Sequence, residues 1–312
     1  MEADSWLGLE LRHFIALKAI AEHGTFGRAA ERLGYTQSAI SQQIAMMERI
    51  VGQKLIDRPG GPKPVSLTEA GLVLLRHADA IAARVQAAQA DLAALDAGES
   101  GPLRIGTYQS VGARVLPQLL REFTSEWPDV DVTLQESADD GQLAAMVERG
   151  ELDLSFVILP LEPGPYETVE LFRDPYVLVV PAGSPLAGRD RAPSLRELLD
   201  QPLISNRTCR TTTRVEDRLR HAGREPNIAF RTDDNGTVQG LVAAGVGIAI
   251  VPLLTVDESD TAVRVVDLGD RIPPRLVGLA WHRDRRQTRA AQAFVELAQK
   301  LTSGTGAAAE AA

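Results

Sequence analysis

The first 52 residues carry apolar side chains at spacings of three and four, which is the pattern of amphipathic helices. These positions are Leu11, Phe14, Leu17, Ala21, Phe26, Ala29, Ala30, Leu33, Ile40, Ile44, Met47 and Ile50. Thr25 and Thr36 are suitable N-caps for two of the segments, and Gly34 suits the C′ position between them. The pattern therefore predicts two short helices joined by a tight turn within residues 25–52, with another helix before them.

The helix that begins after Thr36 has short polar side chains between its inward-facing apolar positions. They are Gln37, Ser38, Ser41 and Gln42. Such donors and acceptors near a helix N-terminus suit the base edges of the major groove, where recognition helices lie. We therefore predict a helix-turn-helix that binds DNA. Small helical domains that do not bind DNA share this periodicity, so the segments that follow must support the prediction.

Two short apolar stretches, 55–56 and 65–67, flank the turn-forming run 59–62. This pattern predicts a β-hairpin, or wing, with Arg58 at its base and Lys63 at its tip. Both cations would be placed to contact phosphates or the minor groove. A solvated loop with incidental charges would be the better interpretation if no helix pair preceded it. With the helix pair, residues 9–67 are expected to form a winged helix-turn-helix domain.

Residues 68–95 are expected to form one helix of roughly 42 Å, capped by Thr68. Its apolar seam follows a heptad pattern. The seam residues are Leu74, Ala78, Ile81, Val85, Ala88, Leu92 and Leu95. We expect this linker helix to pack on the same helix of a second subunit, and packing on the larger domain of its own chain is the alternative. The small and turn-forming residues 96–102 predict a hinge.

From residue 103 to residue 303 strands and helices alternate, which predicts an α/β domain, and the βαβαβ run over residues 103–159 predicts a parallel sheet with right-handed crossovers. The expected strands are 103–107, 130–136, 152–159, 176–180, 203–205, 228–231, 246–252 and 276–281. Two helices are expected to open with capping boxes, Ser194 with Glu197 and Thr213 with Glu216. We assign 103–162 and 269–303 to one lobe and 163–268 to another. The fold class is thus α/β multidomain.

Ligands of open α/β sheets bind beyond the carboxyl ends of the strands. Several polar residues follow the expected strands. They are Thr107, Tyr108, Gln109, Ser110, Asp139, Asp140, Cys209, Arg210, Thr211, Thr212 and Asn235. Any one of them has the composition of an ordinary helix cap, and their occurrence together favours a ligand cleft. Segment 209–212 precedes a helix N-terminus, which favours an anionic group of a ligand.

Composition and charge remove several classes of protein. The net charge of −9 argues against a protein that coats nucleic acid without specificity, although residues 1–67 sum to +1. No apolar run approaches the length of a membrane span. An exported solute-binding protein would require a signal peptide, and none is apparent. The single cysteine, Cys209, excludes an intramolecular disulfide and suits the cytoplasm.

The sequence shows none of the enzyme motifs that we sought. It has no glycine-rich phosphate loop between a strand and a helix, no GxSxG nucleophile elbow and no metal-ligand spacing among its five histidines. We therefore expect no catalytic residues, no metal and no cofactor. An enzyme with a fused DNA-binding domain is the main competing class.

The order of the parts resembles the LysR-type transcriptional regulators over residues 9–303. The specific signature lies in residues 11–58 and in VSLTEAG at 65–71, and weaker support lies in segments 116–132, 148–157 and 240–252. The resemblance implies a winged helix-turn-helix, a dimerising linker helix and a periplasmic-binding-protein-like effector domain. It also implies a homodimer or homotetramer on promoter DNA, whose action on RNA polymerase is altered by a small-molecule effector. A repressor without an effector is the alternative within this class.

The resemblance also assigns roles to individual residues. It places Gln37, Ser38, Ser41 and Gln42 on the base-reading face, Arg58 on the wing, Ser110 at a hydroxyl that commonly holds an effector carboxylate, and Arg210 and Thr211 in a loop that closes over the effector. Tyr108, Gln109 and Asn235 complete the expected effector site. Gln42 departs from the family, since many members have a basic residue there. Asp140 departs too, because carboxylate-sensing relatives have a small hydroxyl or glycine, and we hypothesise an effector with a hydrogen-bond donor or amine near it.

Overall fold

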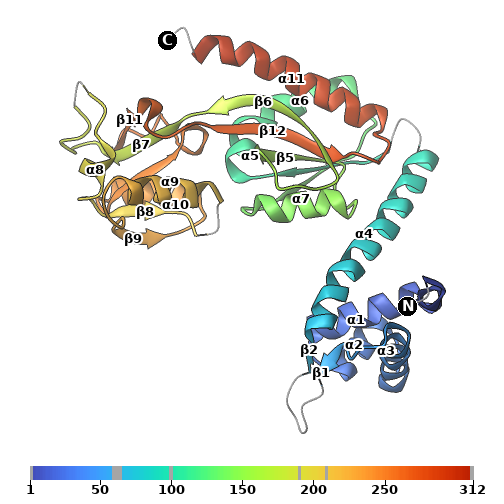
Figure 1. The fold of residues 1–312 in the computed structure, drawn as a ribbon. Coiled ribbons are helices and arrows are strands. Elements are labelled where there is room, and N and C mark those ends of the chain that lie inside the picture. The colour runs from blue at the N-terminus through green and yellow to red at the C-terminus, as the bar shows by residue number, and fades with distance from the viewer. Residues whose placement is uncertain (1–2, 58–64, 98–100, 189–190, 208–209, 310–312) are drawn as a thin grey trace. The chain divides into compact units, whose positions relative to one another are not determined.

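A computed structural model describes residues 3–57, 65–97, 101–188, 191–207 and 210–309 (Figure 1). The chain divides into two compact units, residues 1–90 and 91–312. The elements of the first unit are η1 (Ala3–Gly8), α1 (Leu11–His23), α2 (Phe26–Leu33), α3 (Gln37–Val51), β1 (Ile56–Asp57), β2 (Ser66–Leu67) and the start of α4 (Glu69–Ala97).

The helix-turn-helix forms where the sequence predicts it. The Thr25 hydroxyl accepts a hydrogen bond from Arg28 N, and the Thr36 hydroxyl accepts one from Ala39 N. Gly34 ends α2 with a φ of 71°, a left-handed conformation that favours glycine. The two caps and this glycine therefore set the turn between α2 and α3 locally.

The wing is also confirmed, as an antiparallel pair in which Ile56 lies opposite Leu67 and Asp57 opposite Ser66. The buried core of this unit is apolar and comes from every helix. It consists of Phe14, Ala16, Leu17, Ala19, Ile20, Ala29, Ala30, Ile40, Ile44, Met47, Leu55, Ile56, Leu74 and Ala78. Leu74 and Ala78 come from α4, so its first turns belong to the winged domain.

The seam of α4 is therefore divided between two environments. Leu74 and Ala78 are buried, and Ile81 packs with them against the core of their own winged domain. The expectation that the whole seam meets a second subunit is wrong for this half, because the core of the same unit already covers it. Val85 and Leu92 are exposed, by 38% and 63%, within the unit that contains each of them.

The second unit contains two five-stranded sheets. Its elements are β3 (Leu103–Thr107), α5 (Gln109–Arg114), α6 (Leu116–Glu126), β4 (Val132–Glu136), α7 (Asp140–Glu148), β5 (Leu154–Leu159), β6 (Tyr166–Asp174), β7 (Tyr176–Pro181), α8 (Leu195–Leu198), β8 (Leu203–Ser205), α9 (Arg210–His221), β9 (Ile228–Arg231), α10 (Asn235–Ala243), β10 (Ile248–Pro252), η3 (Leu253–Thr255), β11 (Val263–Asp267), η4 (Gly269–Arg271), β12 (Arg275–His282) and α11 (Arg289–Ala309).

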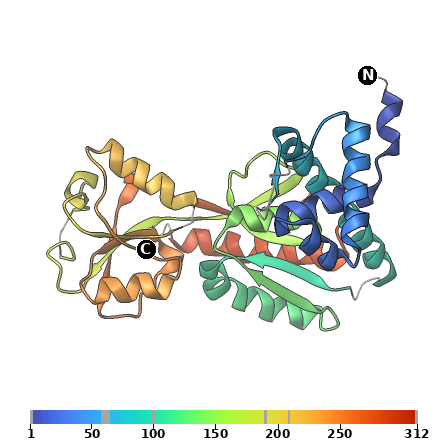
Figure 2. The ribbon, with the colours of Figure 1, turned by 90° about the horizontal axis from the view of Figure 1, so that it is seen from below.

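One sheet has the strand order β4-β3-β5-β12-β6 and the other β11-β7-β10-β8-β9, and we call them with their helices lobe I and lobe II (Figure 2). Both sheets are mixed, because β12 and β6 in lobe I and β7 and β11 in lobe II run antiparallel to their neighbours. The parallel sheet expected for the βαβαβ run 103–159 is confirmed, because β3 pairs in parallel with both β4 and β5. Strand β6 pairs with β12 in lobe I, whereas the sequence places residues 163–268 in the second lobe.

In lobe I, helices α6 and α11 cover one face of the sheet and α7 lies on the other (Figure 1). Phe123 of α6 stacks on Trp127 and meets Phe294 of α11 edge to face, with 5.3 Å between the last two ring centroids. The chain passes between the lobes twice, after Asp174 at the end of β6 and before Arg275 at the start of β12. No helix among the described residues is long and apolar enough to cross a membrane.

Candidate DNA-binding surface and ligand cleft

Helix α3 has two faces of opposite character. Ile40, Ile44 and Met47 are fully buried on one face. On the other, Gln37, Ser38 and Gln42 are exposed and Ser41 is partly exposed. The polar positions therefore lie where the sequence predicts them, on the open face of the first two turns. The Ser38 hydroxyl lies 3.0 Å from the hydroxyl of the cap residue Thr36, so part of its hydrogen bonding is already used.

Two exposed side chains extend this face and were missed by the sequence analysis. Arg49 follows Gln42 by seven residues, about two turns further along the same face of α3, and it is exposed. Tyr35, which is 51% exposed, immediately precedes the Thr36 cap. An exposed aromatic ring beside a polar helix face is a signal that the apolar periodicity alone does not reveal.

The buried carboxylate of Glu48 fixes the wing to α3. It accepts hydrogen bonds from Leu55 N at 3.0 Å, Ile56 N at 3.4 Å and Lys54 Nζ at 2.9 Å. Burial by itself raises the pKa of Glu48, but these donors outweigh burial and hold the pKa below its usual value. The wing residues Arg58 and Lys63 lie outside the described residues.

A cavity of about 370 Å³ lies between lobe I and lobe II. Five predicted effector residues line it together: Tyr108, Gln109, Ser110, Asp140 and Asn235. The structure thus brings together residues that are up to 127 positions apart in the chain, at the strand ends where the sequence analysis expects a ligand. Arg210 and Thr211 begin α9, but their side chains lie outside the described part of the chain, as does Cys209.

A buried arginine side chain, Arg275, also lines the cavity, and it was not predicted from the sequence. Nε and Nη2 of Arg275 contact the same oxygen of Asp174 at 2.8 and 2.6 Å, and Nη2 donates to Ser110 Oγ at 2.8 Å. The guanidinium lies 5.1 Å from the ring centroid of Tyr108. The other Asp174 oxygen accepts from Leu254 N at 3.1 Å. The single arginine after Pro273 and Pro274 gave no periodic signal by which to find it.

A polar bridge joins the two lobes at one side of the cavity. Gln109 Nε2 of lobe I donates to Asp234 Oδ2 at 2.9 Å, and Gln109 Oε1 accepts from Asn235 N at 2.9 Å. Asp234 also caps α10 through Thr237 N. The hydrogen bond from Gln109 is the largest influence that holds the pKa of Asp234 below its usual value. Gln109 and the Asn235 backbone therefore join the lobes.

Carboxylates outnumber cations around the cavity. Glu136, Asp140, Asp233 and Asp234 line it, and Arg275 is the cationic side chain that lines it among the described residues. Asp140 is 9% exposed and belongs to the first turn of α7, where the helix dipole favours a negative charge. The described side chains of the wall thus carry more negative than positive charge.

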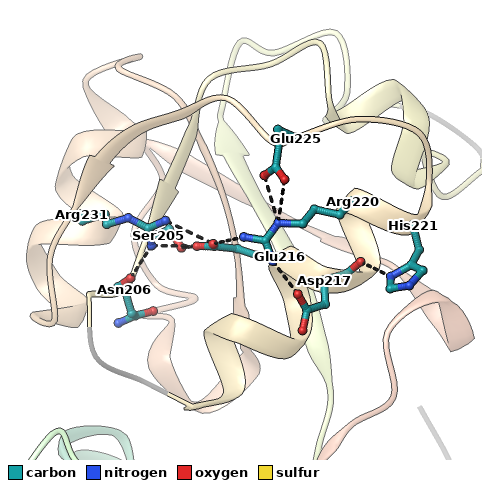
Figure 3. Close-up of polar contacts among 8 residues, drawn as sticks. All are labelled: Ser205, Asn206, Glu216, Asp217, Arg220, His221, Glu225 and Arg231. Carbon is teal, nitrogen blue, oxygen red and sulfur yellow. Dashed lines mark hydrogen bonds and ion pairs between the residues drawn. The ribbon is translucent and has the colours of Figure 1, made fainter.

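Ser205 and Asn206 of lobe II line the cavity. A group of hydrogen-bonded charged side chains lies beside them (Figure 3). The Glu216 carboxylate of α9 accepts from Ser205 Oγ at 2.8 Å and from both terminal nitrogens of Arg231 at 2.7 and 3.1 Å. Arg231 Nη1 also donates to Asn206 O at 3.0 Å. Burial raises the pKa of Glu216, but these bonds outweigh burial and lower it.

This arrangement corrects the expected capping box of Thr213 with Glu216. Helix α9 begins at Arg210, so Glu216 lies in its second turn, beyond the reach of an N-cap. Its carboxylate binds Ser205 and Arg231 instead. The other capping box, Ser194 with Glu197, is confirmed at the start of α8.

The two units thus define a helix-turn-helix protein with a two-lobed domain around a ligand-sized cavity. A family model described as the LysR substrate binding domain matches residues 96–303, and one described as a bacterial regulatory helix-turn-helix protein of the lysR family matches residues 11–72. The chain therefore belongs to the LysR family, and it is a transcriptional regulator with a DNA-binding helix-turn-helix and an effector-binding domain.

Individual relatives agree with this assignment. The chain is 30% identical to the HTH-type transcriptional regulator YnfL of Escherichia coli (strain K12), over 92% of this chain and 97% of that one. It is 33% identical to the HTH-type transcriptional regulator AlsR of Bacillus subtilis (strain 168), over 78% and 80%. The structure of full-length CbnR in complex with its target DNA has the same fold, with a TM-score of 0.62, 23% identity and coverage of 94% and 99%.

Proposed function

We propose that the chain reads promoter DNA in a bacterial cytoplasm through the polar face of α3. The observation that carries this proposal is the division of α3 into a fully buried apolar face and an open face with Gln37, Ser38, Ser41 and Gln42. Amide and hydroxyl groups at these positions suit bases, while cations on a wing suit phosphates, which carry no sequence information. The chain acts by binding, without a catalytic step.

Two variants test this division of roles. Ser41→Ala should change the preferred bases at one position of the site, whereas Arg58→Ala should weaken binding to every sequence and reduce the salt slope by about 1. Selection from a randomised DNA library, followed by titration at several salt concentrations, measures both. An unchanged base preference in Ser41→Ala would remove Ser41 from the readout.

The proposed active form is a homodimer or homotetramer with two-fold symmetric half-sites. Val85 and Leu92 of α4 are exposed, and Ala88 lies between them on the same seam. An exposed leucine on a heptad seam is typical of a helix that pairs with another helix. Leu92→Glu should therefore lower the mass measured by light scattering, with Glu69→Gln, at the other end of the helix, as a control. A monomeric parent protein at micromolar concentration would contradict the proposal.

The cavity between the lobes is the proposed effector site, from which a bound small molecule alters the grip on DNA and the action on RNA polymerase. Its volume of about 370 Å³ is within the usual range for small-molecule sites, about 300–1,000 Å³. Fragments of the native genome that the protein retains would identify its operons. Transcription from those operons with and without added metabolites then distinguishes an effector-controlled regulator from a repressor that has no effector.

A further inference from the structure

The charge around the cavity limits what the effector can be. Arg275 is buried, and its guanidinium is already engaged by Asp174 and Ser110. A ligand with only a carboxylate would thus meet a neutralised cation and several carboxylates. Even one further cation would leave more acidic than basic groups among the described side chains of the wall.

The buried hydroxyl of Ser110 points to a second property of the ligand. Ser110 is 3% exposed, and its oxygen accepts a hydrogen bond from Arg275. A guanidinium has no acceptor, so the Ser110 hydroxyl hydrogen must be donated elsewhere. Among the described residues, no group accepts a hydrogen bond from that hydroxyl. A ligand oxygen in the cavity would supply the acceptor that a buried donor requires.

The acidic residues come from both lobes. Glu136 ends β4 and Asp140 begins α7 in lobe I, whereas Asp233 and Asp234 precede α10 in lobe II. Asp233 and Asp234 accept bonds from Arg207 N and Gln109, but within the described part of the chain the Glu136 carboxylate has no hydrogen-bonding donor. No group of three or more His, Cys, Asp or Glu side chains among the described residues is arranged to hold a metal ion. An organic cation, which can extend between separated carboxylates, therefore fits this wall.

We propose that the effector is an aminocarboxylate of the α-amino acid class, with an oxygen on the Ser110 hydroxyl and its ammonium group beside Glu136 and Asp140. This inference rests on the proposed function, because it takes the cavity as the effector site. The ammonium group would offset the negative charge of these two lobe I carboxylates. The apolar residues Ile158, Val215, Ile250 and Pro252 line the remaining wall and would contact the ligand side chain.

Matched ligands test the two ends of the molecule separately. The twenty standard L-amino acids and the 2-hydroxy acids with the same side chains are added to the full chain in thermal-shift assays, and positive ligands are titrated by calorimetry. We expect at least one amino acid to bind at least about tenfold more tightly than its 2-hydroxy acid, which lacks the ammonium group. Asp140→Asn and Glu136→Gln should each reduce the affinity for the amino acid. Ser110→Ala should also reduce it, because this variant lacks the hydroxyl that would bind a carboxylate oxygen.

Asp129→Asn is the matched control, because Asp129 is an exposed acid of lobe I that lines no described cavity. It should leave affinity unchanged. Tighter binding of the 2-hydroxy acids, no response to any amino acid, or unaltered affinity in Asp140→Asn would each overturn the inference. Retention of genomic DNA fragments is measured on the same preparations. Loss of that retention would refute the proposed function, whereas retention with a negative ligand screen would refute only the ligand class.

Discussion

Replacing Arg275 with methionine should destabilise the effector unit strongly. The side chains of Arg275 and Asp174 are 5% and 1% exposed, and their contacts are 2.6 and 2.8 Å long. The variant leaves the Asp174 carboxylate buried, with Leu254 N as a remaining donor at 3.1 Å. Removing one partner of a buried ion pair costs about 3–5 kcal/mol, because the other charge is left uncompensated.

The size of this effect should depend on pH. Burial raises the pKa of Asp174, and in the parent protein Arg275 and backbone amides oppose that effect. Without Arg275 the folded variant takes up a proton at Asp174 at a higher pH than the unfolded chain, whose aspartate pKa is about 3.9. The folded state then binds more protons, so the variant loses stability as pH rises. The destabilisation should therefore be larger at pH 8 than at pH 5.

Thermal unfolding of the full chain measures the effect, with fluorescence from Trp127 and Trp281 of lobe I as the signal. For a unit of this size, 3–5 kcal/mol corresponds to a fall in Tm of about 6–20 °C at pH 8. Arg104→Met is the matched control, because Arg104 and Asp153 form a 2.7 Å pair that is 31% and 19% exposed. Its loss should cost about 1 kcal/mol or less. Equal Tm values for the two variants would refute the reasoning.

Two further predictions concern the winged domain. A Cβ on Gly71 would lie 2.1 Å from the Leu55 carbonyl oxygen, so Gly71→Ala should disrupt the domain. Gly27 lies inside α2 with open space around it, so Gly27→Ala should stabilise the domain by about 0.5–1 kcal/mol. Denaturant unfolding that ranks the two variants otherwise would contradict the geometry. The pKa of Glu48 is lower in the folded state, so Glu48 contributes stability at pH values above its unfolded pKa, and this stability is lost as the pH falls through the lowered folded pKa. Glu48→Gln should therefore be less stable at pH 7 and less sensitive to acid, and identical pH profiles of Tm would show that Glu48 does not fix the wing.

Local signals explain why the DNA-binding unit was predicted well. The caps Thr25 and Thr36, the C′ glycine Gly34 and the periodic apolar positions each act within a few residues. The bonds that fix α2 and α3 are therefore short in sequence separation. The same applies to the Ser194 cap of α8. The packing partner of α4 could not be predicted from local signals. An apolar heptad seam indicates that a helix packs against another element, but it does not identify that element.

The parts that were missed depend on pairing between distant segments. In β6 only Leu171 and Asp174 are buried, so its alternation of apolar and polar residues is weak. Its position follows from pairing with β12, about 100 residues later. Glu216 has the spacing of a capping box with Thr213, but the tertiary contact with Arg231 prevails over that local pattern. The cleft residues could be predicted because the order of strands and helices in the sequence shows where each strand ends. Arg275 could be found only from its contacts in the folded structure.

Arg275 links the ligand-facing hydroxyl to the crossing between the lobes. Its guanidinium holds Ser110 of lobe I on one side and Asp174, the last residue of β6, on the other. Asp174 in turn accepts from Leu254 N, which belongs to η3 after the last strand residue of β10 in lobe II. These contacts form a continuous chain of short polar bonds from the cavity to the second lobe. Because each bond has a narrow range of favourable lengths, the chain restricts movement of lobe II relative to Ser110. Arg275→Lys keeps the charge but loses the planar fork that contacts both neighbours, so it should weaken this restriction while leaving the net charge of the cavity unchanged.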